Sequence, residues 1–123
     1  MMPTSIGWYN GWSPGERLAT TPIQKQAVKD GRLHRPSHCS ICGSSKQVWF
    51  HNERYDEPLN VYSICRACHR CLHERFDQPE PWIRLVAAHE TSGAWFTLLS
   101  LDPGSRYTAY RNTYPEDLPR QAG

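Results

Sequence analysis

The sequence predicts a small α+β fold, and three observations carry this prediction. Four of the five cysteines form two Cys-x2-Cys pairs, which are Cys39 with Cys42 and Cys65 with Cys68. Between the pairs, the segments 47–51 and 61–64 are short and rich in β-branched and aromatic residues, a pattern typical of a β-hairpin. The run 66–76 contains good helix formers and neither Gly nor Pro, so it predicts a helix that starts at the second cysteine pair.

Length and composition limit the fold further. The 123 residues are enough for one domain and too few for two independent cores. Hydrophobic residues make up 38% of the chain, which is lean for a core of this size, and ten Pro with eight Gly argue against a helical bundle. We therefore expect a loop-rich fold that something other than packing helps to hold together, and the cysteines are the candidates.

The compartment decides how those cysteines are interpreted. The N-terminal sequence has neither the cationic start nor the apolar run of a secretory signal, and no stretch approaches the roughly 20 apolar residues of a membrane span. We expect a cytoplasmic protein with no membrane partner. In a reducing compartment, clustered cysteines indicate metal binding rather than disulfides, and an odd number of them agrees with that.

Residues 1–38 are expected to form an N-terminal extension with short helices. Ser13 precedes Pro14 and stands three residues before Glu16, which is the pattern of a capping box at a helix start. A second helix is predicted from Thr21 onward, and Gly31 is its terminating residue.

Residues 39–76 form the predicted central module, in which a polar loop with Pro58 joins the two strands. Residues 77–123 form a C-terminal extension with a helix over 81–91, a strand over 94–101, a second strand over 106–110 and a frayed tail. The helix carries a stripe that we expect to pack into the core, namely Trp82, Leu85, Val86 and His89.

The two Cys-x2-Cys pairs predict a structural zinc site at Cys39, Cys42, Cys65 and Cys68. Each pair can hold one side of a tetrahedral Zn²⁺ from a tight turn. Gly43 suits a turn whose N–H groups face the sulfurs, and the second pair lies at a helix N-terminus, where the dipole favours a thiolate. The alternatives are disulfides, unrelated buried thiols and an iron–sulfur cluster, although the fourth Cys before a Pro that the last requires is missing.

Because structural zinc contributes on the order of 10–16 kcal/mol to folding, we expect the 39–76 module to unfold without it. Cys71 is left over, and we interpret it as a small buried hydrophobic residue.

A second group of candidate ligands follows the cysteines. His69 and His73 are spaced i, i+4 on the predicted helix, so both rings project from one face. The hairpin is tied to the same helix by the zinc and should bring His51 and Asn60 close to that face. Divalent ions accept such mixed nitrogen and oxygen ligands, and an incomplete protein shell leaves room for water and phosphate.

These motifs together resemble a known family. Cys39-x2-Cys42 followed by FHNERYDEPLNVYSICRACHRCLH is similar to the HNH endonuclease superfamily, whose zinc-stapled treble-clef module has a ββα core. The resemblance covers residues 39–76, about a third of the chain. It implies a metal-dependent endonuclease that hydrolyses DNA phosphodiester bonds, with Mg²⁺, Mn²⁺ or Ni²⁺ at a site separate from the zinc.

The resemblance also implies roles for individual residues. His51 and His73 fall at metal-ligand positions, Asn60 at the family's middle Asn, and His69 directly after the second cysteine pair. Asn52 occupies the position of the family's water-activating His. An amide does not accept a proton at neutral pH, and a positioned general base contributes roughly 10²- to 10⁴-fold to the rate. Shifting the alignment by one residue makes His51 the base but leaves Phe50 at a ligand position.

Charge alone does not identify a partner, because the net charge is only +2. Basic residues gather before the first cysteine pair, and Arg66 and Arg70 are spaced i, i+4 on the helix, but acidic residues are interleaved with them. The expected DNA partner therefore rests on the resemblance. The alternative hypothesis is a treble-clef module without catalytic activity that binds nucleic acid or a protein partner.

Overall fold

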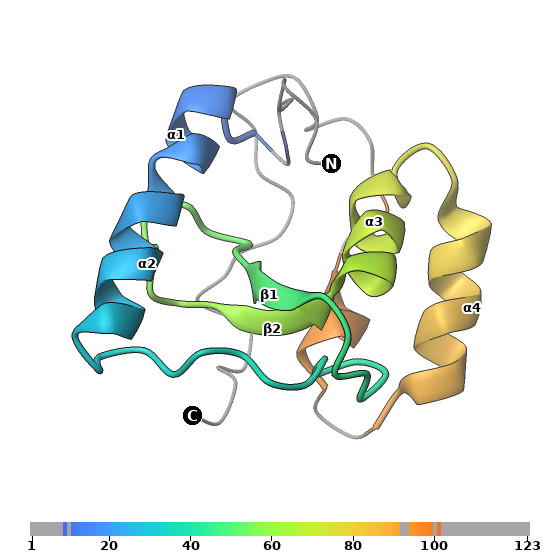
Figure 1. Ribbon diagram of the computed structural model, residues 1–123. Coiled ribbons are helices and arrows are strands. Elements are labelled where there is room, and N and C mark those ends of the chain that lie inside the picture. The colour runs from blue at the N-terminus through green and yellow to red at the C-terminus, as the bar shows by residue number, and fades with distance from the viewer. Residues whose placement is uncertain (1–8, 10, 92–93, 100, 102–123) are drawn as a thin grey trace.

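A two-stranded antiparallel hairpin lies between two pairs of helices in the computed structural model, which describes residues 9, 11–91, 94–99 and 101 (Figure 1). The elements are α1 (Pro14–Leu18), α2 (Thr20–Lys29), β1 (Val48–His51), β2 (Tyr62–Cys65), α3 (Arg66–Glu74), α4 (Pro79–His89) and the 3-10 helix η1 (Trp95–Leu98). The predicted α+β class is confirmed at this level.

The hairpin connects the first cysteine pair to helix α3. Val48 pairs with Cys65 and His51 with Tyr62, so the strands are close to the predicted segments. All four residues of β2 are buried. Helix α3 follows β2 without a linker, because Cys65 is both the last strand residue and the helix N-cap, and its sulfur accepts a hydrogen bond from the Cys68 backbone N–H.

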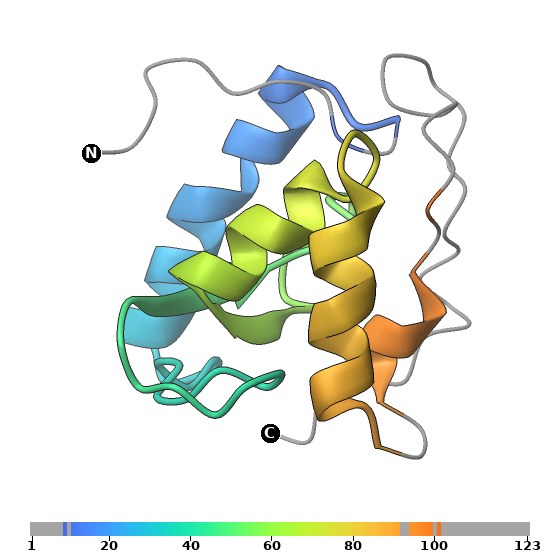
Figure 2. The same ribbon diagram turned by 90° about the vertical axis from the view of Figure 1, so that its right-hand side faces the viewer.

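Helix α4 packs against α3 on the side away from α1 and α2 (Figure 2). It begins at Pro79, two residues before the predicted start, and ends at His89. Trp82 is 2% exposed and belongs to the core, and Leu85 and Val86 pack against that core. His89, the last residue of the predicted stripe, is exposed and does not contribute to it.

The two N-terminal helices begin and end close to the predicted positions. The capping box of α1 is present, since the Ser13 hydroxyl accepts from the Glu16 N–H and the Glu16 carboxylate accepts from the Ser13 N–H. After α2 the chain turns at Gly31, whose φ of +80° lies in the left-handed region that favours glycine.

The strand expected over 94–101 is wrong for the described part of that segment, where the chain forms η1. A strand would point Trp95 and Phe96 to opposite faces. Both side chains are buried, at 6% and 3% exposure, and the tight turn of a 3-10 helix brings both against the core. The strand expected over 106–110 and the tail lie outside the described residues.

The core draws on all three predicted segments of the chain. Tyr9 and Trp95, from the two extensions, are buried in the same cluster as Ile64 and Leu72 of the central module. The boundaries proposed at residues 38 and 76 stay a prediction. Among the described residues, no helix combines the length and the apolar character needed to cross a membrane.

Candidate metal centres

The first candidate centre is the group of four paired cysteines. Their sulfurs all lie within 4.8 Å of one another, and the sulfurs of Cys42 and Cys65 are 3.7 Å apart. Four sulfurs placed tetrahedrally at about 2.3 Å from a zinc ion are about 3.8 Å apart. A disulfide requires about 2.05 Å, and all four thiols are free. The predicted pairs are thus positioned to hold a metal ion.

Backbone N–H groups around the cysteines point toward the sulfurs. Cys39 Sγ accepts from the N–H of Ile41 at 3.4 Å and from that of Cys42 at 3.5 Å, and Cys65 Sγ accepts from Cys68 at 3.4 Å. Gly43 makes the first turn with a φ of +80°, and its N–H donates to the Cys39 carbonyl. Gly43 therefore has the conformation that the sequence predicted for it.

One of the four sulfurs, that of Cys39, favours the thiolate form even without a cation. The Cys68 thiol donates a hydrogen bond to Cys39, which lowers the pKa of Cys39 to about 4 and raises the pKa of Cys68. A thiolate is the form that binds metal. A set of four sulfurs within 4.8 Å of one another fits a structural zinc ion.

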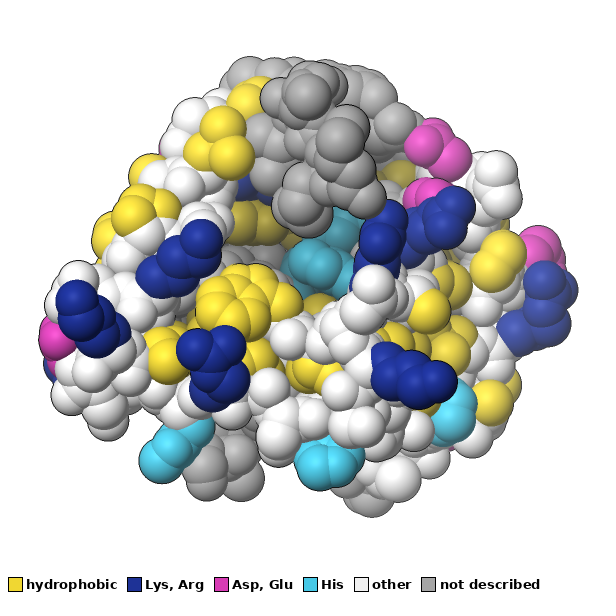
Figure 3. All heavy atoms as spheres, in the orientation of Figure 1, with side chains coloured by type: hydrophobic (Ala, Val, Ile, Leu, Met, Phe, Trp, Pro, Cys, Tyr) yellow, Lys and Arg dark blue, Asp and Glu magenta, His cyan; other side chains and the backbone are white. Residues whose placement is uncertain are grey.

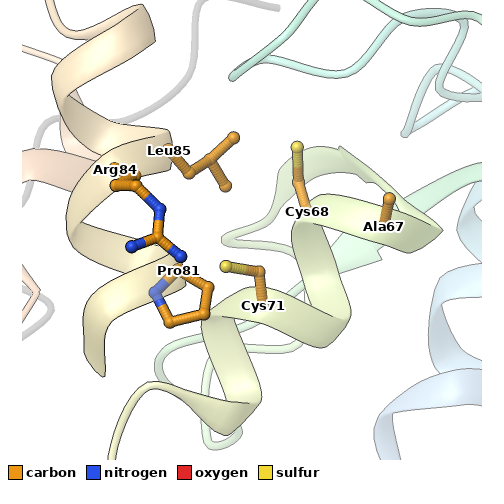
Figure 4. Close-up of a pocket in the computed structure, with 6 residues that line it drawn as sticks. All are labelled: Ala67, Cys68, Cys71, Pro81, Arg84 and Leu85. Carbon is orange, nitrogen blue, oxygen red and sulfur yellow. The ribbon is translucent and has the colours of Figure 1, made fainter. Parts of the chain in front are cut away.

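Cys71 lies outside this group. It is half-buried and packs against the core, rather than being fully buried as expected. Its sulfur points into a cavity of about 370 Å³ between α3 and α4, which Cys68, Pro81 and Arg84 also line (Figure 4). Burial raises the pKa of the Cys71 thiol, so this cysteine is not an activated thiolate.

The second candidate centre consists of three histidines. His51 ends β1, and His69 and His73 stand one turn apart on α3. His69 Nε2 is 3.1 Å from His51 Nδ1 and 2.9 Å from His73 Nε2. Nitrogens bound to one ion at about 2.0–2.1 Å are about 2.8–3.4 Å apart, so the three ring nitrogens could share an ion.

Hydrogen bonding alone does not satisfy these nitrogens. Burial lowers the pKa of all three histidines, that of His69 to about 3, so the rings are neutral at pH 7. A neutral His69 Nε2 has either one proton or one lone pair, and it can make a good hydrogen bond to only one of its two neighbours. A cation accepts the lone pairs of all three, so the donor set fits a divalent metal ion.

The histidine centre opens toward solvent. His51 is buried, but His69 and His73 are partly exposed. Figure 3 shows His side chains on the floor of a hollow between the α1–α2 arm and α3, with Lys and Arg side chains on both sides. A phosphate group could therefore approach these nitrogens from the surface.

Behind His51 lies a buried chain of polar groups. His51 Nε2 is 2.5 Å from Glu53 Oε2, and the Tyr9 hydroxyl donates to the same carboxylate oxygen. The Arg75 guanidinium donates to the Tyr9 oxygen at 2.9 Å. Burial alone would raise the pKa of Glu53, but His51, Arg75 and Tyr9 together lower it, so the carboxylate is ionised.

Asn52, the residue after His51, is engaged in the hairpin loop. Its Oδ1 accepts from Gln24 at 2.6 Å, and its Nδ2 lies within 3.5 Å of three backbone carbonyls of the loop. Gln24 also donates to the Pro58 carbonyl. Asn52 therefore links the loop to α2. Any role in catalysis would need the same amide atoms that these hydrogen bonds already use.

The remaining predicted ligand, Asn60, is also in this loop. It is 8% exposed, and its backbone carbonyl accepts from Asn52. Its role as a metal ligand stays a prediction. The structure brings His69 into the position of a third nitrogen ligand beside His51 and His73, whereas the resemblance gave metal-ligand positions only to His51 and His73.

The sequence did not point to the residues that support the histidines. Glu53 stands two residues after His51, so its spacing could have suggested a carboxylate behind that ring. Tyr9 and Arg75 are 66 residues apart and carry no motif, and only the fold brings them together.

No protein-family model, curated protein or solved structure matches this chain. The protein is therefore described by its fold and its site. It is a small α+β chain with a four-cysteine group positioned to hold a metal ion, next to three histidines whose ring nitrogens converge.

Proposed function

We propose that the chain is an HNH-type endonuclease, built on a treble-clef module that a structural zinc ion holds together. The observation that carries the proposal is the convergence of ring nitrogens from His51, His69 and His73, of which His69 and His73 are partly exposed. The central module has the order of elements that the resemblance implies: a cysteine turn, a hairpin and a helix that starts at the second cysteine pair.

In this proposal His51, His69 and His73 hold a divalent ion such as Mg²⁺, Mn²⁺ or Ni²⁺. When bound, such an ion polarises a phosphodiester and stabilises the leaving oxygen. The chain's own contribution is to keep the three rings neutral and aimed at one point, because burial lowers the pKa of each. The partly exposed rings of His69 and His73 leave that point open to the backbone of a nucleic acid.

Positive charge near the histidines supports DNA as the substrate. The Arg17 guanidinium lies 5.7 Å from the ring centre of Tyr9 and 5.6 Å from that of Tyr55. Its charge contributes, after burial, to the lowered pKa of His69 and His73. Arg66 and Arg70 are exposed on α3. Contacts from such groups to phosphates supply most of the affinity of non-specific DNA binding.

One observation favours the second candidate, a module that binds nucleic acid or protein without cleaving it. The position of the family's water-activating His holds Asn52, whose amide is already bonded to Gln24 and the loop. An active enzyme would need another proton acceptor. The two candidates share the zinc, and where the partner is a nucleic acid they differ only in hydrolysis.

A plasmid-nicking assay separates the candidates. Purified protein is incubated with supercoiled plasmid and Mg²⁺, Mn²⁺ or Ni²⁺, and the wild type is compared with His73→Ala. The matched control is His89→Ala, which removes an exposed histidine from the neighbouring helix α4. The endonuclease proposal expects nicking by the wild type and by His89→Ala, and at least a hundredfold loss in His73→Ala.

Two other results would overturn the endonuclease proposal. Salt-dependent DNA binding without nicking under any of the three metals would support the non-cleaving module. The absence of both binding and nicking, in protein that retains its zinc and its circular dichroism, would exclude DNA as the partner for both candidates.

A further inference from the structure

The buried polar chain behind His51 joins residues from three distant parts of the sequence. Arg75 comes from the end of α3, Tyr9 from the N-terminal segment and Glu53 from the hairpin loop. Their exposures are 0%, 2% and 1%, and that of His51 is 1%. Burying a charge without a partner is costly, so the fold retains Arg75 and Glu53 as a compensating pair with the Tyr9 hydroxyl between them.

The direction of the hydrogen bonds determines the state of the His51 ring. Glu53 Oε2 accepts from the Tyr9 hydroxyl and lies 2.5 Å from His51 Nε2, so a neutral His51 ring that donates across this contact has its proton on Nε2. The lone pair is then on Nδ1, the atom that lies 3.1 Å from His69. The opposite tautomer would direct an N–H at the place where the three nitrogens meet.

Tyr9 controls the position of that carboxylate. Its hydroxyl donates to the same oxygen, Oε2, that His51 uses, and it accepts from Arg75. Its ring also packs against the rings of the site, with centroids 5.7 Å from His51 and 4.5 Å from His73. A residue of the N-terminal segment thus contacts two of the three histidines and the group that orients one of them.

We propose that Tyr9 and Glu53 are positioning residues that hold His51 in the Nε2–H tautomer, and that the affinity of the three-histidine centre for a divalent ion depends on them. The inference rests on the metal centre of the proposed function and adds its control by the N-terminal segment. Partners that orient a metal-binding His typically change metal affinity by about 10- to 100-fold when they are removed.

The experiment measures metal binding directly. Full-length protein, with zinc in the cysteine site, is titrated with Co²⁺, whose visible absorption distinguishes nitrogen ligands from thiolates. The variants are Glu53→Gln and Tyr9→Phe, and the control is Tyr55→Phe, which removes another largely buried hydroxyl that pairs with Arg17. We expect Co²⁺ binding to weaken about 10- to 100-fold in Glu53→Gln and severalfold in Tyr9→Phe, and to stay within twofold in Tyr55→Phe.

A second readout tests the tautomer without the metal. In zinc-loaded protein without Co²⁺, the ¹⁵N chemical shifts of the His51 ring report which nitrogen carries the proton. The wild type should show the proton on Nε2, and Glu53→Gln should show a mixture of the two tautomers. A role in stability alone would lower the melting temperature and leave both the tautomer and the Co²⁺ affinity as in the wild type.

The outcomes separate the inference from the proposed function. If the wild type binds Co²⁺ through histidine and both variants bind it equally well with an unchanged tautomer, the inference is wrong and the metal centre stands. If the wild type binds no Co²⁺ through histidine, the metal centre is wrong and the proposed dependence fails with it.

Discussion

The two candidate metal centres both take residues from α3 but are built in different ways. At the cysteine centre, the sulfurs are held by turns whose supporting N–H groups are two or three residues from the cysteine that they contact. Both centres join distant segments, since Cys42 and Cys65 are 23 residues apart and His51 and His69 are 18 residues apart. The groups behind His51, however, include Tyr9, which is 44 residues from Glu53. The groups that support the first centre are therefore local in sequence, and those that support the second depend on the complete fold.

The two centres meet at adjacent residues of α3. Cys68 is the last cysteine ligand, and His69 is the first histidine of the second centre on that helix. Helix α3 starts at Cys65, another cysteine of the first centre, so the metal ion at the cysteines would fix the start of the helix that positions His69 and His73. The dependence should therefore run in one direction, from the cysteines to the histidines.

Removal of the metal from the cysteines should have the largest effect. A strong chelator, or the variant Cys65→Ser, removes a contribution on the order of 10–16 kcal/mol, which matches or exceeds the stability of most small domains. We expect the helical circular dichroism and the cooperative melting transition to be lost. Co²⁺ binding at the histidines should be lost with them. A chelated protein with an unchanged melting curve would contradict the structural zinc.

Removal of a histidine tests whether the cysteine centre depends in turn on the histidine centre. His73→Ala removes a partly exposed ring and should leave one zinc ion per chain, measured by elemental analysis, and a cooperative melting transition. If His73→Ala also lost the zinc, the two centres would depend on each other, and the one-way order inferred from α3 would be wrong.

The second largest effect is expected at Arg75. Arg75→Met leaves the buried carboxylate of Glu53 without its compensating charge, and breaking one side of a buried pair costs about 3–5 kcal/mol. Chemical denaturation of the zinc-loaded protein measures this loss. The double variant Glu53→Gln with Arg75→Met removes both charges, so its loss should be smaller than the sum of the two single losses. Additive losses would show that the two charges do not interact.

The same contrast explains what the sequence could predict. The cysteine group, the hairpin and α3 follow from spacing and from local propensity, and the structure has them close to the expected positions. The placement of His51 beside His69 and His73 was also predicted, because the expected zinc ties the hairpin to the start of the helix. Tyr9 and Arg75 were not, since a long-range hydrogen bond leaves no periodic signal in the chain.

The strand prediction for the C-terminal segment was wrong for a related reason. Its apolar run around Trp95 and Phe96 has a strand-like composition, but a strand needs a partner, and both side chains are buried against the same core. Tertiary packing overrode the local preference. Asn52 is a third case: the resemblance placed it at the position of a catalytic His, and the hydrogen bonds that link it to the loop and to α2 could not be predicted from that position.

A smaller effect is expected from Asn52→Ala. The substitution removes the Asn52 oxygen that accepts from the Gln24 amide and the N–H donor to the Asn60 carbonyl, and losing a partner of a buried polar group costs about 1–3 kcal/mol. Comparison with Gln24→Ala and the double variant should give a coupling energy above about 0.5 kcal/mol. An Asn52→Ala protein that is as stable as the wild type but inactive in nicking would instead assign Asn52 to catalysis.

The smallest effect on stability should come from Arg70→Gln. Arg70 is 76% exposed and forms an i, i+4 ion pair with Glu74 at 3.4 Å, and such pairs contribute about 0.3–0.5 kcal/mol. Arg70 is also the neighbour of His69 in the sequence of α3, so we expect its charge to contribute to the binding of a phosphate near the histidines. We expect an almost unchanged denaturation midpoint, weaker DNA binding, and a slope of log affinity against log salt that is shallower by about one. Glu74→Gln is the matched control, because it breaks the same ion pair and keeps the arginine.

If both variants weakened DNA binding equally, the effect would come from the ion pair and not from a phosphate contact. In that case Arg70 contributes only to the local stability of α3. The surface that binds DNA would then have to lie on the α1–α2 side of the histidines.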